Sequence, residues 1–364
     1  MNTVDIFLSL VKSELWQKSL PFELEMDDRL FQQVMIICQM QTVEGLVANS
    51  LIKNHIKLSR YNAAKTFATR VYITSENTTI NNELQALCNL LSSHQIRFFV
   101  VKGQTLSVLY PHPECRTCGD IDFYVYPDSF DKALQIIENE WKVSIQNENE
   151  ESEQHVCFTH NKVHFEMHFC LMKFASRRNQ RVFDKMIAES ALTNRLVGNV
   201  QVPVLEEELN LVYTFLHLYH HLIELGVGLR QFCDIAILMS RMEMDSNQKK
   251  RIIGILRQLG AIRPFHIIEV LLHQKLGLSD KKMLFPITSS DHKYKEFIMK
   301  IVFKRGNFGK FGRKNAVRSG WKYNLETFCT KIKHYGMLFS LSPRENLAYF
   351  LNVLPKRAIS IMKA

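Results

Sequence analysis

Apolar positions over the first 95 residues recur at the spacing of amphipathic helices. Two sets of apolar side chains each fall on one helical face, namely Ile6, Leu10 and Leu15, and Leu30, Val34 and Cys38. The stretch 59–95 consists of helix-compatible residues and contains neither Pro nor Gly to end a helix. We therefore expect a helical N-terminal region at residues 1–95.

The pattern changes at residue 97, where short apolar or alternating runs typical of strands begin. The expected strands are 97–101, 119–125, 141–145, 155–159 and 162–169. The expected helices are 104–110 and 129–139. The acidic stretch 146–154 is expected to form a hairpin loop, and His160-Asn161 is expected to join the last two strands. These elements predict a small mixed sheet within residues 96–203.

From residue 205 onward, the apolar positions return to helical spacing. One buried stripe is predicted to consist of Leu205, Leu209, Val212, Leu216, Tyr219 and Ile223. Gly-Val-Gly at 226–228 interrupts it, and further helices are expected at 229–240, 247–259 and 262–276. The chain is thus predicted to be an α+β protein whose small sheet is flanked by the N-terminal helices and a C-terminal helical domain, 204–364.

Composition excludes wholesale disorder, because 46% of the 364 residues are apolar and 23% are charged. The net charge of +10 favours anionic partners such as nucleotides, nucleic acid or a membrane surface. The eight cysteines are scattered, which fits a reducing compartment better than a disulfide framework. We see no signal peptide and no apolar run of about 18 residues, so a cytoplasmic, soluble protein is expected.

Much of the excess positive charge lies in residues 300–333. This basic segment holds ten Lys or Arg residues against one acid, Glu326. Aromatic side chains are interleaved with the charges, among them Phe308, Phe311, Trp321 and Tyr323. Nucleic acid is one expected partner, bound through phosphates and stacking, and an anionic membrane surface is another. A solvated basic face is the alternative interpretation.

The central motif is Asp120-x-Asp122. On a strand, residues two apart point to the same side, so Asp120, Asp122 and Tyr124 are expected on one face. Two adjacent carboxylates repel each other unless a cation lies between them. Carboxylate oxygens suit Mg²⁺, which takes its other ligands from water and substrate phosphates. The motif therefore predicts a magnesium site, with a solvated sheet edge as the alternative.

Two neighbouring patterns add to this motif. A predicted strand ends in Lys102-Gly103 and enters a helix, an arrangement that presents backbone N–H groups to a phosphate. Downstream, the predicted strand 162–169 carries Glu166 between His164 and His168 on its polar face. A charge in such an apolar strand is costly unless it is paired or binds a metal. Glu166 is therefore the candidate third carboxylate.

Taken together, these motifs resemble a bacterial family of poorly characterised nucleotidyltransferases of the DNA polymerase beta-like superfamily. The similar runs, over about residues 95–240, are VVKGQTLSVLYPHPECRTCGDIDFYV, VHFEMHF and GVGLRQFCDIAIL. The resemblance implies metal-dependent transfer of a nucleoside monophosphate from an NTP, with ATP weakly favoured, to an unknown acceptor. Asp120, Asp122 and Glu166 would be catalytic and would hold Mg²⁺ or Mn²⁺ in a two-metal scheme.

The resemblance also implies a set of nucleotide-binding residues, which are Lys102, Gly103, Gln104, Thr105, Arg116, Arg230 and Asp234. The superfamily's usual Gly-Ser pair is absent here, because Gln104 follows Gly103. Thr105, Ser107 or Lys102 is the candidate replacement for the serine contact. Arg230 and Asp234 are four residues apart on a predicted helix, so an intrahelical ion pair is the alternative to closure of that helix over the nucleotide.

Other functions stay open at this stage. If Glu166 pairs with Lys162, the chain binds nucleotides without turning them over. The alternatives are an inactive nucleotide- or RNA-binding regulator and an interaction protein at a membrane or a polysaccharide-assembly complex.

Two further motifs are weaker. Cys115-x-x-Cys118 is interpreted as two incidental thiols rather than a zinc or redox pair. His217, His220, His221 and Glu224 share a predicted helix and are interpreted as a buried polar face, with a metal site as the alternative.

Overall fold

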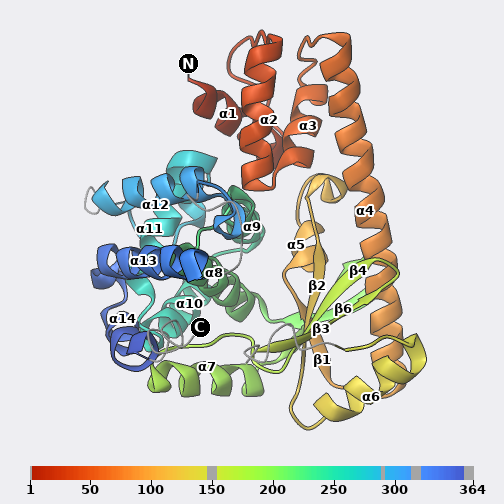
Figure 1. The fold of residues 1–364 in the computed structure, drawn as a ribbon, viewed down its shortest axis with the longest axis vertical. Coiled ribbons are helices and arrows are strands. Elements are labelled where there is room, and N and C mark those ends of the chain that lie inside the picture. The colour runs from red at the N-terminus through yellow and green to blue at the C-terminus, as the bar shows by residue number, and fades with distance from the viewer. Residues whose placement is uncertain (1, 146–153, 288–291, 313–320, 356–364) are drawn as a thin grey trace.

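The N-terminal region is helical, as the apolar spacing predicts. The computed structural model describes residues 2–145, 154–287, 292–312 and 321–355 (Figure 1). Its first four helices are α1 (Thr3–Trp16), α2 (Asp28–Gln41), α3 (Glu44–Lys53) and α4 (Arg60–Ser93). The 34-residue α4 is capped at its N-terminus by Ser59, whose side chain accepts a hydrogen bond from the Asn62 backbone N–H. It runs along most of the height of the molecule in this view (Figure 1).

A four-stranded mixed sheet lies beside α4. Its strands are β1 (Phe98–Val101), β2 (Asp120–Val125), β3 (His155–His160) and β4 (Val163–His168). The spatial order is β1-β2-β4-β3, in which β2 and β4 are parallel and the other pairs are antiparallel. This arrangement places the carboxyl-bearing strands, β2 and β4, side by side in the middle of the sheet.

Short helices connect these strands. Helix α5 (Gly103–Ser107) follows β1, a 3₁₀ turn covers Pro113–Cys115, and α6 (Phe130–Trp141) follows β2. The prediction of a strand at 141–145 is wrong, because α6 continues to Trp141 and residues 142–145 belong to no strand. Trp141 continues the buried side of α6 and stacks on His160, with ring centroids 4.2 Å apart. The hairpin loop predicted over 146–154 falls mostly outside the described residues.

Residues 170–205 contain elements that the hydrophobic pattern alone did not reveal. Helix α7 (Arg177–Glu189) precedes a two-stranded antiparallel hairpin, β5 (Leu192–Val197) and β6 (Val200–Leu205). Gly198 takes a positive φ of 56° in the turn of this hairpin.

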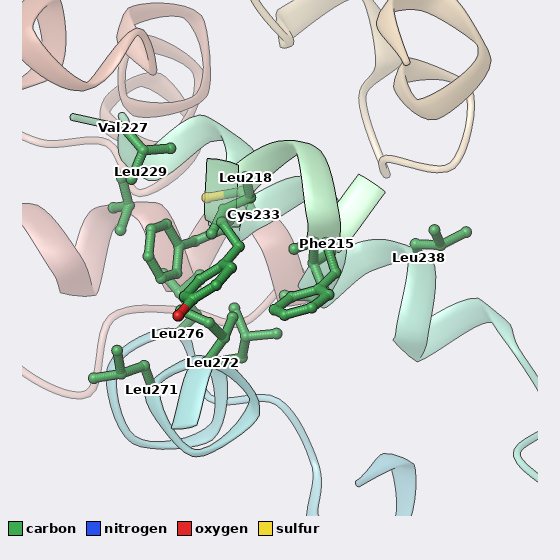
Figure 2. Close-up of a cluster of buried hydrophobic side chains, with 14 of the residues drawn as sticks. Phe215, Leu218, Val227, Leu229, Cys233, Leu238, Leu271, Leu272 and Leu276 are labelled. Atoms are coloured by element: carbon green, nitrogen blue, oxygen red, sulfur yellow. The ribbon is translucent and has the colours of Figure 1, made fainter. Parts of the chain in front are cut away.

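The C-terminal region is a bundle of helices around α8. The longer helices are α8 (Glu207–Glu224), α9 (Leu229–Arg241), α10 (Ser246–Gln258), α11 (Ile262–Leu271), α12 (His292–Arg305) and α13 (Trp321–Met337). Shorter elements are Leu272–Leu276, Asp280–Lys282, Asn307–Gly309, Phe339–Leu341, α14 (Pro343–Ala348) and Tyr349–Val353. The predicted stripe from Leu205 to Ile223 is buried. Figure 2 shows Phe215 and Leu218 of α8 packed with Leu272 and Leu276.

Both faces of the central sheet are buried. Ile121, Phe123 and Val125 of β2 pack in one apolar cluster with residues of α4 and α6. Tyr124, on the opposite face, belongs to a larger cluster that extends into the N-terminal and C-terminal helices. Among the polar residues that share this second face, Asp122 and His168 are buried, whereas Asp120 and Glu166 are half-buried. The α+β class is confirmed, and the division at residues 95 and 203 stays a prediction.

The basic segment 300–333 is described only in part. It includes the end of α12 and the start of α13, whereas residues 313–320 lie outside the described ranges. Arg305 forms an ion pair with Glu326, with Nη1 and Oε1 3.8 Å apart, and Lys331 forms one with Glu224. These two cations are thus partnered within the fold. Over the described ranges, none of the helices has the length and apolar character needed to cross a bilayer.

Candidate functional site

One cavity of about 330 Å³ brings together most of the residues singled out in the sequence. Its walls come from the β1–α5 turn, β2, β4, α8 and α9. The predicted residues that line it are Lys102, Gly103, Arg116, Asp120, Asp122, Glu166, Arg230 and Asp234. Side chains separated by more than 100 residues in the chain therefore meet in one place.

Strand pairing places the three carboxylates. In the parallel pair β2–β4, Asp122 lies opposite Glu166 and Asp120 lies opposite His164. Because alternate residues of a strand share a face, Asp120, Asp122 and Glu166 project to the same side of the sheet. The apolar residues between them face the opposite core, so the face expected from the sequence is the one observed. Asp122 is only 3% exposed.

Lys102 links the β1–α5 turn to the acid pair. Its Nζ donates a hydrogen bond to Asp122 Oδ1 at 2.9 Å and lies 3.1 Å from His217 Nε2. The backbone at Lys102 has φ 57° and ψ −145°, a conformation that a non-glycine residue rarely adopts. Such strain persists only where the surrounding structure enforces it, and it is concentrated at functional sites. Here it aims the ammonium group into the cavity.

The pKa values of the two aspartates, Asp120 and Asp122, are shifted in opposite directions. Burial alone would raise the pKa of Asp122, but Lys102 and the hydrogen bond from His168 hold it well below its ordinary value. Burial and the neighbouring Asp122 carboxylate raise the pKa of Asp120, against the opposing effect of Lys102. Burial would lower the pKa of Lys102, yet the carboxylates around it, Asp122 foremost, raise it. The cavity thus holds a fixed lysine cation and one acid that is short of positive partners.

His168 connects Asp122 with Glu166. Its Nε2 is 2.9 Å from Asp122 Oδ1 and 3.5 Å from Glu166 Oε2. Burial lowers the pKa of His168, but hydrogen bonding to these two carboxylates raises it overall. Glu166 thus has a histidine as its ionic partner, whereas the sequence left Lys162 open for that role.

Histidines of α8 form another wall of the cavity. His217, His220 and His221 all line it, and the Nε2 atoms of His217 and His221 are 3.1 Å apart. Burial and the nearby Lys102 hold the pKa of His217 well below its ordinary value, and burial lowers that of His221 to about 3. Both rings are therefore neutral and half-buried, and the interpretation of this histidine cluster as a polar helix face stays a prediction.

Arg116 and Asp234 form a buried pair at the α9 side. Arg116 donates through Nε and Nη2 to the two carboxylate oxygens of Asp234, at 2.7 and 2.8 Å. Tyr110 donates to the same carboxylate at 2.6 Å, and these partners outweigh burial to lower the pKa of Asp234. Arg230 instead donates to the Thr117 carbonyl at 2.7 Å. Asp234 thus pairs with an arginine from a distant loop rather than with Arg230 of its own helix.

Gln104 and Thr105 are not among the residues that line the cavity. The Gln104 amide donates to the backbone carbonyl and side chain of Asn77, both at 3.2 Å. The Thr105 hydroxyl donates to the Lys102 carbonyl at 2.7 Å. Both side chains stabilise the strained turn, and a role for either in nucleotide binding stays a prediction. Cys115 and Cys118 are free thiols.

The approach of His155 to Glu166 and His168 was the main feature that sequence reasoning missed. One ligand atom each from His155, Glu166 and His168 lies within 4.8 Å of the others. His155 was assigned only to a strand, although its position at the start of an alternating run was the available signal. The full donor set of three carboxylates and two imidazoles on one cavity wall has the chemistry to hold a divalent cation.

Comparisons with known proteins show the family to which the chain belongs. A family model described as "Uncharacterised nucleotidyltransferase" matches residues 27–277. One similar solved structure is an antigenic nucleotidyltransferase-like protein from Paracoccidioides brasiliensis, with 16% identity and a TM-score of 0.34. That match covers 56% of this chain and 92% of that chain. No curated protein matches this chain.

Proposed function

Because the chain belongs to the uncharacterised nucleotidyltransferase family, we propose that it transfers a nucleoside monophosphate from an NTP to an acceptor and releases pyrophosphate. The observation that supports this most strongly is the meeting of Asp120, Asp122 and Glu166 in one cavity with Lys102. An acid cluster beside a fixed cation suits a metal-bound triphosphate better than a neutral ligand. ATP is the first nucleotide to test.

The three carboxylates would hold Mg²⁺ or Mn²⁺. Such a cation, when bound, lowers the pKa of an acceptor hydroxyl and stabilises charge that develops during in-line attack on the α-phosphorus. Asp120 is the acid most in need of a cation, since burial and Asp122 both raise its pKa. Asp122 already contacts Lys102 and His168 through Oδ1, which fixes its orientation in the cavity.

The basic side chains would bind the phosphates. Lys102 keeps its positive charge because the surrounding acids raise its pKa, and it faces the same cavity as the acid pair. Arg116 is held in one orientation by the two-pronged contact with Asp234, so its guanidinium needs little ordering when an anion arrives. Arg230, from α9, lines the same wall. Together these groups would offset the charge of the leaving pyrophosphate.

The test is label transfer from each α-³²P-labelled NTP in the presence of Mg²⁺, with extracts and the protein itself offered as acceptors. Transfer should require Mg²⁺ and should be lost in Asp122→Asn. Asp131→Asn, on the exposed side of α6, is the matched control and should retain activity. Mg²⁺-independent transfer, or transfer that survives Asp122→Asn, would contradict the proposal.

A second candidate function is nucleotide binding without turnover. One observation favours it, since Asp122 Oδ1 is already bonded to Lys102 Nζ and His168 Nε2, as in a site that has lost its metal. Tight NTP binding by calorimetry with no label transfer to any acceptor would support this regulator. An interaction through the basic segment 300–333 stays a separate proposal, tested by binding to nucleic acid and to anionic vesicles.

A further inference from the structure

We propose that His155, Glu166 and His168 form a site for a transition-metal cation of the Zn²⁺ or Co²⁺ class. This cation would be the second one in the cavity, beside the Mg²⁺ or Mn²⁺ of the proposed nucleotidyl transfer, so the inference rests on that proposed function. Cation binding itself is measured without any nucleotide, so the two proposals fail separately. All three residues line the cavity that contains the Asp120–Asp122 pair.

The sheet register brings the three ligands together. His155 of β3 lies directly opposite His168 of β4 in the antiparallel pair. Glu166 precedes His168 by two residues on β4 and therefore projects from the same face. One ligand atom from each lies within 4.8 Å of the others. Tetrahedral bonds of about 2.1 Å place ligand atoms about 3.4 Å apart, so small side-chain rotations suffice to close the site.

The environment of His168 is that of a metal ligand. Its Nε2 is 2.9 Å from Asp122 Oδ1, the kind of carboxylate contact that fixes the ring and tautomer of a ligating histidine. Its Nδ1 is buried and has no hydrogen-bond partner within the part of the chain that the structure describes. A buried ring nitrogen that lacks a hydrogen bond costs free energy, which a bound cation would recover.

The ligand types decide which cation fits. Mg²⁺ prefers oxygen ligands in octahedral geometry, whereas imidazole nitrogens suit Zn²⁺ and similar transition metals. Two imidazoles and one carboxylate supply three protein ligands, and because all three face the cavity, a fourth position is open to water or substrate. His217 is excluded from this set, because its Nε2 is 3.1 Å from the cationic Lys102 Nζ.

The test is the absorption spectrum of the full-length apoprotein titrated with Co²⁺, together with equilibrium dialysis against Zn²⁺. We expect one Co²⁺ to give visible bands of four- or five-coordinate geometry, and we expect millimolar Mg²⁺ to leave them in place. His155→Gln should weaken binding at least about tenfold. His94→Gln, which removes a surface imidazole bonded to Glu140, should leave binding unchanged.

Separate controls distinguish a loss of folding from a loss of the site, and the site from the proposed function. Far-UV circular dichroism of His155→Gln, and of His155→Asn as a second variant, shows whether lost binding reflects lost structure. Equal Co²⁺ affinity in folded His155→Gln, or displacement of Co²⁺ by equimolar Mg²⁺, would overturn the site. Mg²⁺-dependent transfer without Co²⁺ binding would overturn the site and leave the proposed function standing. Co²⁺ binding without any transfer would uphold the site and count against that function.

Discussion

The ammonium group of Lys102 donates a hydrogen bond to Oδ1 of Asp122 over 2.9 Å. Val101, the residue before it, lies opposite Asp122 in the β1–β2 register, so the contact crosses between neighbouring strands. The two side chains are only 16% and 4% exposed. The hydrogen bond thus joins the strained turn at Lys102 to Asp122 of β2 in a poorly solvated environment. Each of the two charges is stabilised there by the other.

Removing the lysine charge should therefore destabilise the fold. Lys102→Met leaves Asp122 buried without its cation, and we expect a loss of about 3–5 kcal/mol in the free energy of unfolding. Adding Asp122→Asn should recover part of this loss, because the two residues are coupled. Urea unfolding of wild type, both single variants and the double variant measures the coupling. Lys185→Met, at a side chain 73% exposed, is the control, and a coupling energy near zero would refute the prediction.

Asp234 should act on nucleotide binding through Arg116. Asp234→Asn removes the charge that holds the guanidinium at 2.7 and 2.8 Å, so we expect a loss of about 3 kcal/mol in stability. In the folded fraction, the KM for the NTP should rise more than kcat falls. Tyr110→Phe removes only one hydrogen bond to the same carboxylate and should cost about 1 kcal/mol. Equal effects of the two variants would contradict this order.

Magnesium should stabilise the protein through Asp120. Its pKa is raised by burial and by Asp122, so a cation should relieve the repulsion between these carboxylates. We expect the melting temperature of wild type to rise with Mg²⁺ concentration, as for any ligand of the folded state. Asp120→Asn should melt at or above the wild-type temperature without Mg²⁺ and should lose most of the Mg²⁺ response. An undiminished response in this variant would place the cation elsewhere.

The stability of the protein should depend on pH through Glu269, a buried residue outside the cavity. Its carboxylate accepts hydrogen bonds from the backbone N–H groups of Leu284 and Phe285. Burial nevertheless raises its pKa from the ordinary 4.5 to about 7. The folded state thus binds more protons than the unfolded state between these values, so stability should fall as pH rises through this window.

At 1.36 kcal/mol per pKa unit, this group should contribute a loss of about 3 kcal/mol between pH 4 and pH 8. Glu269→Gln cannot ionise, so its unfolding free energy should lack this component. The difference between the two proteins in chemical denaturation at several pH values isolates the effect. A difference that stays constant with pH would show that Glu269 ionises normally.

Local sequence patterns were sufficient for most elements of the fold. The helix-compatible run 59–95 became α4, and the alternating run from Val163 to His168 became β4, because side-chain periodicity reports directly which face is buried. The strand expected at 141–145 failed because Trp141 packs as the last turn of α6. The hairpin of β5 and β6 went unassigned, although Val200, Val202 and Val204 alternate along β6 in the pattern of a strand.

The sequence by itself determined the chemistry available at the site, since Asp120, Asp122, Glu166 and Lys102 were identified from spacing and from a family resemblance that the family model confirms. Only the tertiary structure decided their partners. Lys102 pairs with Asp122, Asp234 pairs with Arg116, and His155 joins Glu166 and His168. These contacts connect residues on different strands, helices and loops, and strand order and helix packing, rather than distance along the chain, bring them together.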